Sequence, residues 1–224
     1  MSALVDMFNF LPPLLHGAYI TVSVSLISYG LALVFGLLIG IARVSRHKSL
    51  RVTAAFYIQF IRGTPMLLQL FFIYYVLPYG GILLSPFISG VIGLSGNYAA
   101  YMAEVFRSGI QAIPKGQWEA AAALGMSRKG AMRRIILPQA IRIIIPPLGN
   151  FFVAIFKDSA LVSVITLRDL TFTAEILAAA TFKHFEIFGM VAAIYLAISY
   201  PTAKLVEWVE ARLEVTLRGA KVQQ

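Results

Sequence analysis

Five segments of this chain are long and apolar enough to cross a bilayer as a helix, which takes about 20 residues. They lie at residues 17–42, within 52–77, and at 86–106, 140–156 and 188–209. The fourth contains Pro146 and Pro147, so we expect an interrupted helix that is buried in protein or lines a cavity. The pattern predicts an all-α polytopic membrane protein with five transmembrane helices.

The composition agrees with a membrane protein. Hydrophobic residues make up 59% of the 224 residues and charged residues 13%, whereas a soluble domain is about half apolar and about a quarter charged. The mean hydropathy is +0.80. The absence of cysteine excludes disulfides and cysteine-bound metals. Because His16, His47 and His184 are scattered along the chain, no metal site is expected.

Most of the 19 Lys and Arg residues fall in the loop after the first span, in a long loop between the third and fourth spans, and in the C-terminal tail. Loops rich in Lys and Arg stay in the cytoplasm, which predicts an external N-terminus and a cytoplasmic C-terminus. We divide the chain into an external segment (1–16), a membrane domain (17–212, with its loop at 107–138) and a cytoplasmic tail (213–224). This distribution accounts for the net charge of +9 without nucleic acid, which would require a soluble basic face with stacking aromatics.

The long basic loop has the features of two short helices. Pro114 favours a helix start and Gly125 a helix end. Between them, Ala120–Ala123 are small helix formers that let another surface approach closely, and Glu119 is expected in the first turn, where the helix dipole favours an anion. Ser127 is placed to cap a second helix, whose basic side chains face water or lipid headgroups. The spacing alone fits an ordinary solvated loop equally well.

Several of these residues resemble a known family. Glu119, Ala120, Ala121, Gly125, Leu137 and Pro138 have the spacing of the EAA loop of ABC importer permeases. Other stretches are similar to the polar amino-acid branch of that family: Arg62-Gly63-Thr64-Pro65 with Gln69, Ala100-Tyr101 with Glu104 and Arg107, Gly149-Asn150, and Lys157-Asp158-Ser159. The resemblance covers nearly the whole chain.

The resemblance implies a permease subunit in a bacterial cytoplasmic (inner) membrane. Two permease chains, expected to form a homodimer with a heterodimer left open, would surround a central path. Two ATPase subunits would dock on the EAA loops, and an extracytoplasmic binding protein would deliver a polar amino acid. This chain has no GxxxxGK(S/T) phosphate loop. ATP and Mg²⁺ are therefore expected on the ATPase, and neither a catalytic residue nor a cofactor is expected on this chain.

Polar residues inside the spans have two interpretations each. Arg62 and Glu104 are ionisable residues within spans, where such groups are usually paired or functional. We expect a structural ion pair between them, with a gate or substrate contact as the alternative. Gln69, Asn97 and Tyr98 either line the substrate path or form hydrogen bonds between helices.

The stretch after the interrupted fourth span is the candidate for substrate passage, because transporters expose polar groups at broken helices. It contains Asn150, Phe151, Lys157 and Asp158. Asp158 and Lys157 could bind the ammonium and carboxylate of an amino acid, or they could face solvent at the membrane surface. A family member that carries basic amino acids is expected to have an acid where Phe151 stands, so a cationic substrate is disfavoured.

Two other classes of protein remain alternatives. An ion-coupled secondary transporter or channel subunit would need paired half-domains or a buried ion relay, and the chain shows no internal repeat and few acids at membrane depth. A membrane-embedded enzyme would need a catalytic set such as Ser/His/Asp or a carboxylate pair inside the membrane, and none is evident in the sequence.

Overall fold

Every regular element that the structure describes is a helix, as the sequence predicts. The structure is a computed structural model that describes residues 2–221, with side chains for residues 9–213. The elements are α1 (Ser2–Arg43), α2 (Lys48–Gly63), α3 (Met66–Phe71), η1 (Phe72–Val76), η2 (Leu77–Gly80), α4 (Pro86–Gln111), α5 (Lys115–Ala123), α6 (Arg128–Ala131), η3 (Met132–Ile136), α7 (Leu137–Asp158), η4 (Ser159–Ile165), α8 (Leu170–Thr181) and α9 (His184–Lys221). The segments η1 and η3 are π-helical, and η2 and η4 are 3₁₀ helices.

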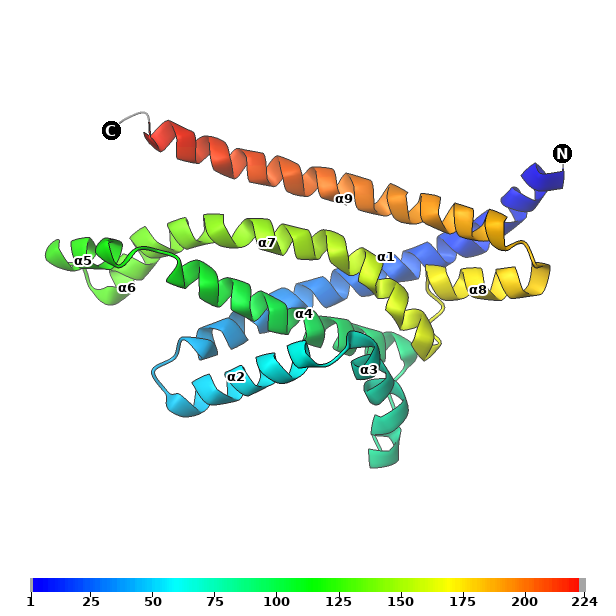
Figure 1. Ribbon diagram of the computed structural model, residues 1–224, viewed down its shortest axis with the longest axis horizontal. Helices are drawn as coiled ribbons and strands as arrows, with labels where there is room; N and C mark the ends of the chain where they lie inside the picture. The colour runs from blue at the N-terminus through cyan, green and yellow to red at the C-terminus, as the bar shows by residue number, and fades with distance from the viewer. Residues whose placement is uncertain (1, 222–224) are drawn as a thin grey trace.

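Helix α4 lies at the centre of the bundle, with α1 packed along it (Figure 1). Two glycines of α1 make this contact close. A Cβ atom on Gly36 would lie 2.8 Å from the Cβ of Met102, and one on Gly40 would lie 3.0 Å from the carbonyl oxygen of Ala103. The missing side chains let the two helix backbones approach, as small residues do throughout membrane proteins.

The second predicted span is sharply bent and does not form one continuous helix. Helix α2 and the stretch that begins at Met66 meet at an angle of 104°. Thr64 lies between them in extended conformation, with φ −116° and ψ 142°. The cause is local, because a residue before proline is pushed out of the helical region, and Pro65 also lacks the N–H that would continue the helix.

After the bend, α3 packs against α4 and η4, and the end of the arm at η2 projects away from the bundle (Figure 1). Its outward side chains are large and apolar. Phe72, Tyr75, Val76 and Tyr79 are all exposed, Tyr79 to 93%. An apolar surface of this extent is covered by lipid or by another protein in the working molecule.

Helix α7 is continuous through Pro146 and Pro147, so the expected interruption of the fourth span is wrong. An interior proline costs about 3 kcal/mol in a soluble helix, but neighbouring helices compensate in a membrane bundle. Helices α4 and α9 flank α7 here. The α-helical geometry ends only at Asp158, and the 3₁₀ segment η4 follows from Ser159.

The number of spans stays a prediction. By length and composition, three helical stretches of the described chain qualify: Asn9–Arg43, Arg128–Ile165 and His184–Leu213. The bent α2–α3 pair makes a fourth if it counts as one span. Helix α4 does not qualify, and its buried face carries polar residues such as Ser89 and Asn97.

The basic segments gather at one end of the bundle. The α1–α2 turn, the α5–α6 loop and the end of α9 lie there, whereas the start of α1 and the α8–α9 turn lie at the other end (Figure 1). We call these the loop end and the N-terminal end. The predicted segment 1–16 is continuous with α1 from Ser2 on, and the predicted tail 213–224 continues α9 to Lys221. Residues 1 and 222–224 of these segments lie outside the described residues.

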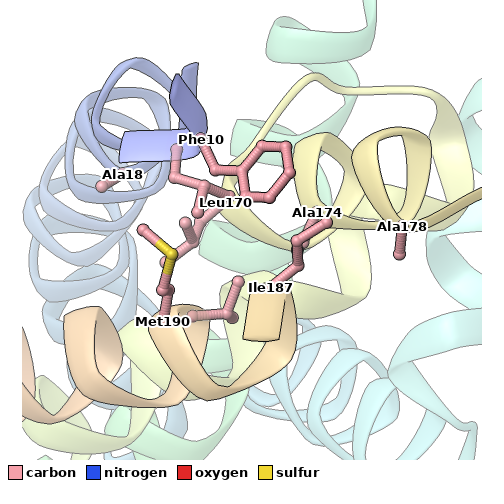
Figure 2. Close-up of a cluster of buried hydrophobic side chains, with 9 residues drawn as sticks. Phe10, Ala18, Leu170, Ala174, Ala178, Ile187 and Met190 are labelled. Carbon is pink, nitrogen blue, oxygen red and sulfur yellow. The ribbon is translucent and has the colours of Figure 1, made fainter. Parts of the chain in front are cut away.

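Helices α1, α8 and α9 meet near the N-terminal end in a cluster of buried apolar side chains (Figure 2). Leu170 and Ala174 of α8 and Ile187 of α9 are fully buried in it. In Figure 2 they converge with Phe10 of α1 and Met190 of α9. The cluster fixes the short helix α8 against the two long ones.

Asp169 caps the start of α8 at the edge of this cluster. Its Oδ1 accepts a hydrogen bond of 2.9 Å from the backbone N–H of Phe172. Its Oδ2 is buried and has no hydrogen-bond partner among the described residues. Burial is the largest influence on this group and raises the pKa of Asp169 to about 7.

We expect the thermal stability of the protein to fall between pH 4 and pH 7.5. Over that range the unfolded state releases the Asp169 proton, whereas the folded state retains it up to about pH 7, so rising pH favours unfolding. In detergent, the Tm at pH 5.5 should exceed the Tm at pH 8.5 by several degrees. Asp169→Asn keeps the cap and should abolish most of this difference, whereas Glu186→Gln, at an exposed acid, should preserve it. An unchanged pH dependence in Asp169→Asn would contradict the assignment.

Candidate functional site

The α2–α3 bend, the middle of α4 and the second half of α7 enclose a hollow of about 590 Å³, which we call the central hollow. Its volume is in the range of small-molecule binding sites. It is lined by Arg62, Gly63, Thr64, Pro65, Met66, Asn97, Tyr98, Tyr101, Phe151, Ala154, Asp158 and Leu161. The bend therefore places extended backbone at the wall of a cavity, where transporters commonly bind substrate.

One wall of the central hollow is aromatic. The ring of Phe151 meets the ring of Tyr98 edge-on, with centroids 5.8 Å apart and an interplanar angle of 89°. It meets the ring of Tyr101 at 6.1 Å and 61°. These edge-to-face contacts fix the three rings relative to one another. The rings form an aromatic wall of the hollow.

Two opposite charges line the same hollow. The guanidinium of Arg62 lies over the ring of Tyr101, 5.1 Å from its centroid, in the geometry of a cation–π contact. The Oδ2 of Asp158 accepts a hydrogen bond of 2.6 Å from the hydroxyl of Tyr98. Within the described residues neither Arg62 nor Asp158 forms an ion pair. Both charges are thus available to a ligand that carries a carboxylate and an ammonium group.

The structure brings together four of the seven residues predicted for the substrate path. Asn97, Tyr98, Phe151 and Asp158 line the central hollow. Gln69, Asn150 and Lys157 are not among its lining residues, and the last two are exposed on α7. Contact of any of these side chains with substrate stays a prediction.

Gln69 holds the bend instead. Its Nε2 donates to the carbonyl oxygen of Ile61 at 2.8 Å and to both oxygens of Thr64, at 3.1 Å and 2.9 Å. The carbonyl of Ile61 is the group that Pro65 leaves without its helical donor. The Oε1 of Gln69 accepts from Asn97 at 3.1 Å, which joins the bend to α4. The amide therefore satisfies the polar groups that the bend exposes.

The predicted pairing of Glu104 with Arg62 is wrong. Glu104 pairs with Arg107 of its own helix at 2.6 Å and with Arg43 of α1 at 3.6 Å. These contacts join α1 to α4 near the loop end. Arg62 instead lines the central hollow, so a substrate contact, which the sequence offered as the alternative, stays a prediction.

The EAA loop has the two helices that the sequence predicts, joined by a tight turn at Gly125. The N–H groups of Gly125 and Met126 donate to the carbonyls of Ala122 and Ala121, both at 3.0 Å. This pair of bonds is the Schellman motif, which requires a left-handed residue at the position of Gly125. Its φ is +71°. The hydroxyl of Ser127 then caps α6 by accepting from Gly130 at 3.2 Å.

Helix α5 presents small residues to the outside. Ala121 is buried, whereas Ala120 and Ala122 are exposed beside the exposed Glu119. Glu119 lies in the second turn, because the helix starts at Lys115 and its first turn has no acid. The expected interaction of Glu119 with the first-turn dipole is therefore wrong.

A second hollow of about 450 Å³ lies between α5 and α6, and we call it the coupling hollow. Trp118 and Glu119 of α5 and Arg128 of α6 line it. Arg128 lies over the ring of Trp118 at 5.7 Å. This arrangement fixes the angle between the two loop helices and leaves a groove edged by small side chains.

The loop and the central hollow are connected by a single helix. From Arg128 the chain stays helical through η3 and α7. Leu137 and Pro138 start α7, and Phe151 and Asp158 lie on the same helix, two turns apart. A continuous helical path therefore links α6 to the residues of the central hollow.

Sequence analysis missed several residues that line the central hollow. Thr64, Pro65 and Tyr101 belong to stretches that it quoted only for their family resemblance. The available signal was the Gly63-Thr64-Pro65 run itself, because Gly and Pro inside an apolar span indicate a broken helix.

Comparison with known proteins agrees with this geometry. An L-cystine transport system permease protein of Bacillus subtilis (strain 168) is 37% identical over 207 residues, which cover 92% of this chain and 88% of that protein. A probable glutamine ABC transporter permease protein of the same organism is 37% identical over 214 residues, or 96% of this chain and 98% of that protein. The crystal structure of an amino acid ABC transporter with histidines matches with a TM-score of 0.88 and 40% identity, covering 93% of this chain and 97% of that chain.

The family match is extensive as well. Residues 32–215 match the family described as the binding-protein-dependent transport system inner membrane component. This range includes the bend, the central hollow, both loop helices and most of α9. The chain is therefore a multi-pass membrane protein that belongs to the family of binding-protein-dependent transport system inner membrane components.

Proposed function

We propose that this chain is the permease subunit of an ATP-driven importer that moves a polar amino acid across the inner membrane by alternating access. One observation carries the proposal: a single helix, Arg128–Asp158, joins the EAA loop to the central hollow. A partner that moves the loop can thereby reshape a cavity that has a cation, an anion and an aromatic wall.

The partner on the loop is a dimer of ABC ATPase subunits. Exposed Ala120 and Ala122 allow close approach to α5, and the Gly125 turn fixes the direction of that helix. ATP and Mg²⁺ are bound and ATP is hydrolysed on the ATPase, since this chain has no phosphate loop. This chain acts as a transport component and not as an enzyme.

The substrate is a neutral polar amino acid. Arg62 can bind the α-carboxylate and Asp158 the α-ammonium, and both groups are free of ion pairs within the described residues. Phe151 stands where a carboxylate would be needed to bind a basic substrate side chain, so the central hollow has no second anion for one. Similar proteins named for cystine and glutamine agree with this class.

A second permease copy and an external binding protein complete the assembly. The exposed apolar arm from α3 to η2 supplies surface for a second copy. The binding protein docks at the N-terminal end, which faces the outside, while the loop end and the C-terminus face the cytoplasm. The clustering of basic segments at the loop end supports this orientation.

The decisive experiment is uptake in liposomes that contain the permease, its ATPase and its binding protein. We expect uptake of labelled glutamine or cystine only when ATP is enclosed with the ATPase. A proton or sodium gradient alone should give none. Gradient-driven uptake without ATP would instead support the alternative, an ion-coupled secondary transporter or channel.

The orientation leads to a labelling prediction. Lys115→Cys, at the loop end, should react with an impermeant maleimide only after the membrane is opened, and Glu186→Cys, at the N-terminal end, should react in intact cells. Both positions are exposed, and the chain has no native cysteine to give background. Reaction of both variants from one side would contradict the proposed topology.

A further inference from the structure

A basic hollow lies beside α6 and η3, and no step of the proposed transport cycle uses it. It has a volume of about 730 Å³ and is lined by Met126, Ser127, Lys129, Gly130, Arg133 and Arg134. The three basic side chains are exposed. Within the described residues none of the three forms an ion pair. Three uncompensated positive charges around one cavity form a site for an anion.

The basic hollow is separate from the coupling hollow. The coupling hollow is lined by residues of α5 together with Met126, Arg128 and Ala131, whereas the basic hollow contains no residue of α5. Met126 is the one residue that lines both. A partner that grips α5 can therefore leave the basic side chains open to a different ligand.

The basic hollow also adjoins an apolar surface on the same helix. Leu137 follows Arg134 by three residues and Ile141 follows Leu137 by four, so these two apolar residues share one face of α7. They are 39% and 42% exposed. Since the rise is about 1.5 Å per residue, the guanidinium groups lie within about two turns of exposed apolar side chains. The combination of cations and an adjoining apolar stripe matches the two ends of a phospholipid.

We propose that the basic hollow binds the headgroup of an anionic phospholipid, with the phosphate at Lys129, Arg133 and Arg134 and an acyl chain along Leu137 and Ile141. Arg contacts phosphate oxygens through two parallel N–H groups, and basic residues at the end of a membrane helix attract anionic headgroups. Inorganic phosphate could bind the same basic side chains through its oxygens, but it has no apolar part to contact Leu137 and Ile141. Bound lipid would anchor α6 at the membrane surface while α5 engages its partner.

The test is lipid binding to the full chain, purified in mild detergent with its co-expressed ATPase. Native mass spectrometry should show preferential binding of phosphatidylglycerol over phosphatidylcholine of the same chain length. Each basic residue near a headgroup contributes roughly a fivefold gain in binding. The variant K129Q/R133Q/R134Q should therefore bind phosphatidylglycerol roughly 100-fold more weakly. R133K/R134K, which keeps the charges but loses the paired N–H contacts, should be weakened much less than the triple variant.

A matched control is available at the same end of the bundle. The variant R46Q/K48Q/R51Q removes three exposed charges from the α1–α2 region and should keep the lipid preference. The proposal is overturned if K129Q/R133Q/R134Q binds phosphatidylglycerol normally, or if millimolar inorganic phosphate displaces the lipid. It is also overturned if the triple variant loses the ATPase but keeps the lipid, since the charges would then serve an acidic protein surface.

Discussion

Gly125→Val is expected to abolish ATP-driven uptake while the permease stays inserted and the ATPase still hydrolyses ATP. Gly125 has φ +71°, a left-handed conformation that costs other L-residues roughly 1–2 kcal/mol and β-branched residues more. A Cβ at this position meets nothing within 4 Å, so the effect comes from the backbone and not from a clash. Valine would break the Schellman turn and aim α5 away from its partner. Uptake and ATP hydrolysis, measured side by side in liposomes, test this.

Two variants separate the backbone effect from general damage. Gly125→Asn should retain much of the uptake, because asparagine enters the left-handed region more readily than valine. Gly189→Val makes the same substitution on exposed α9, where a Cβ also meets nothing and φ is not positive. It should transport normally. Full uptake by Gly125→Val would show that the loop is a passive connector.

The EAA loop could be predicted because its signals are local. Pro114 precedes α5, Gly125 ends it and Ser127 caps α6, each as its residue type favours. Each signal depends on neighbours within four residues, so the sequence contains it. Only the place of Glu119 within the helix was predicted wrongly. The helix starts at Lys115, so Glu119 falls in the second turn and not in the first.

The broken span could not be assigned correctly from proline content. Both spans contain prolines, but the chain breaks at Pro65 and continues through Pro146 and Pro147. A break needs a donor for the carbonyls that it frees, and at Ile61 that donor is the Gln69 amide, eight residues away. Such a contact depends on how the chain folds back, and periodicity does not reveal it. The broken helix that lines the central hollow is therefore the second span and not the fourth.

Only some of the residues that line the central hollow could be predicted, because the others depend on how the helices pack. Asp158 and Phe151 stood out because they follow the Gly149-Asn150 pair on one helix. Arg62 was paired with Glu104 because each seemed to need a counter-charge in the membrane. The local partner Arg107, three residues from Glu104, was the better choice on helix geometry alone.

Phe151→Glu is expected to change the substrate preference of the transporter. The new carboxylate would lie two helical turns from Asp158, on the same wall of the central hollow. A substrate with a second cation, arginine or lysine, would then meet an anion at each end. A charge-assisted hydrogen bond of this kind contributes about 1.5–3 kcal/mol, so the ratio of arginine to glutamine uptake should rise roughly tenfold or more.

The matched control for this change is Phe151→Gln, which has the same shape without the charge. It loses the edge-on contacts with Tyr98 and Tyr101 and should weaken uptake of all substrates without favouring arginine. Competition between labelled glutamine and unlabelled arginine in the reconstituted system measures the ratio directly. If Phe151→Glu and Phe151→Gln give the same ratio in well-expressed protein, Phe151 supports the aromatic wall and does not face the substrate side chain.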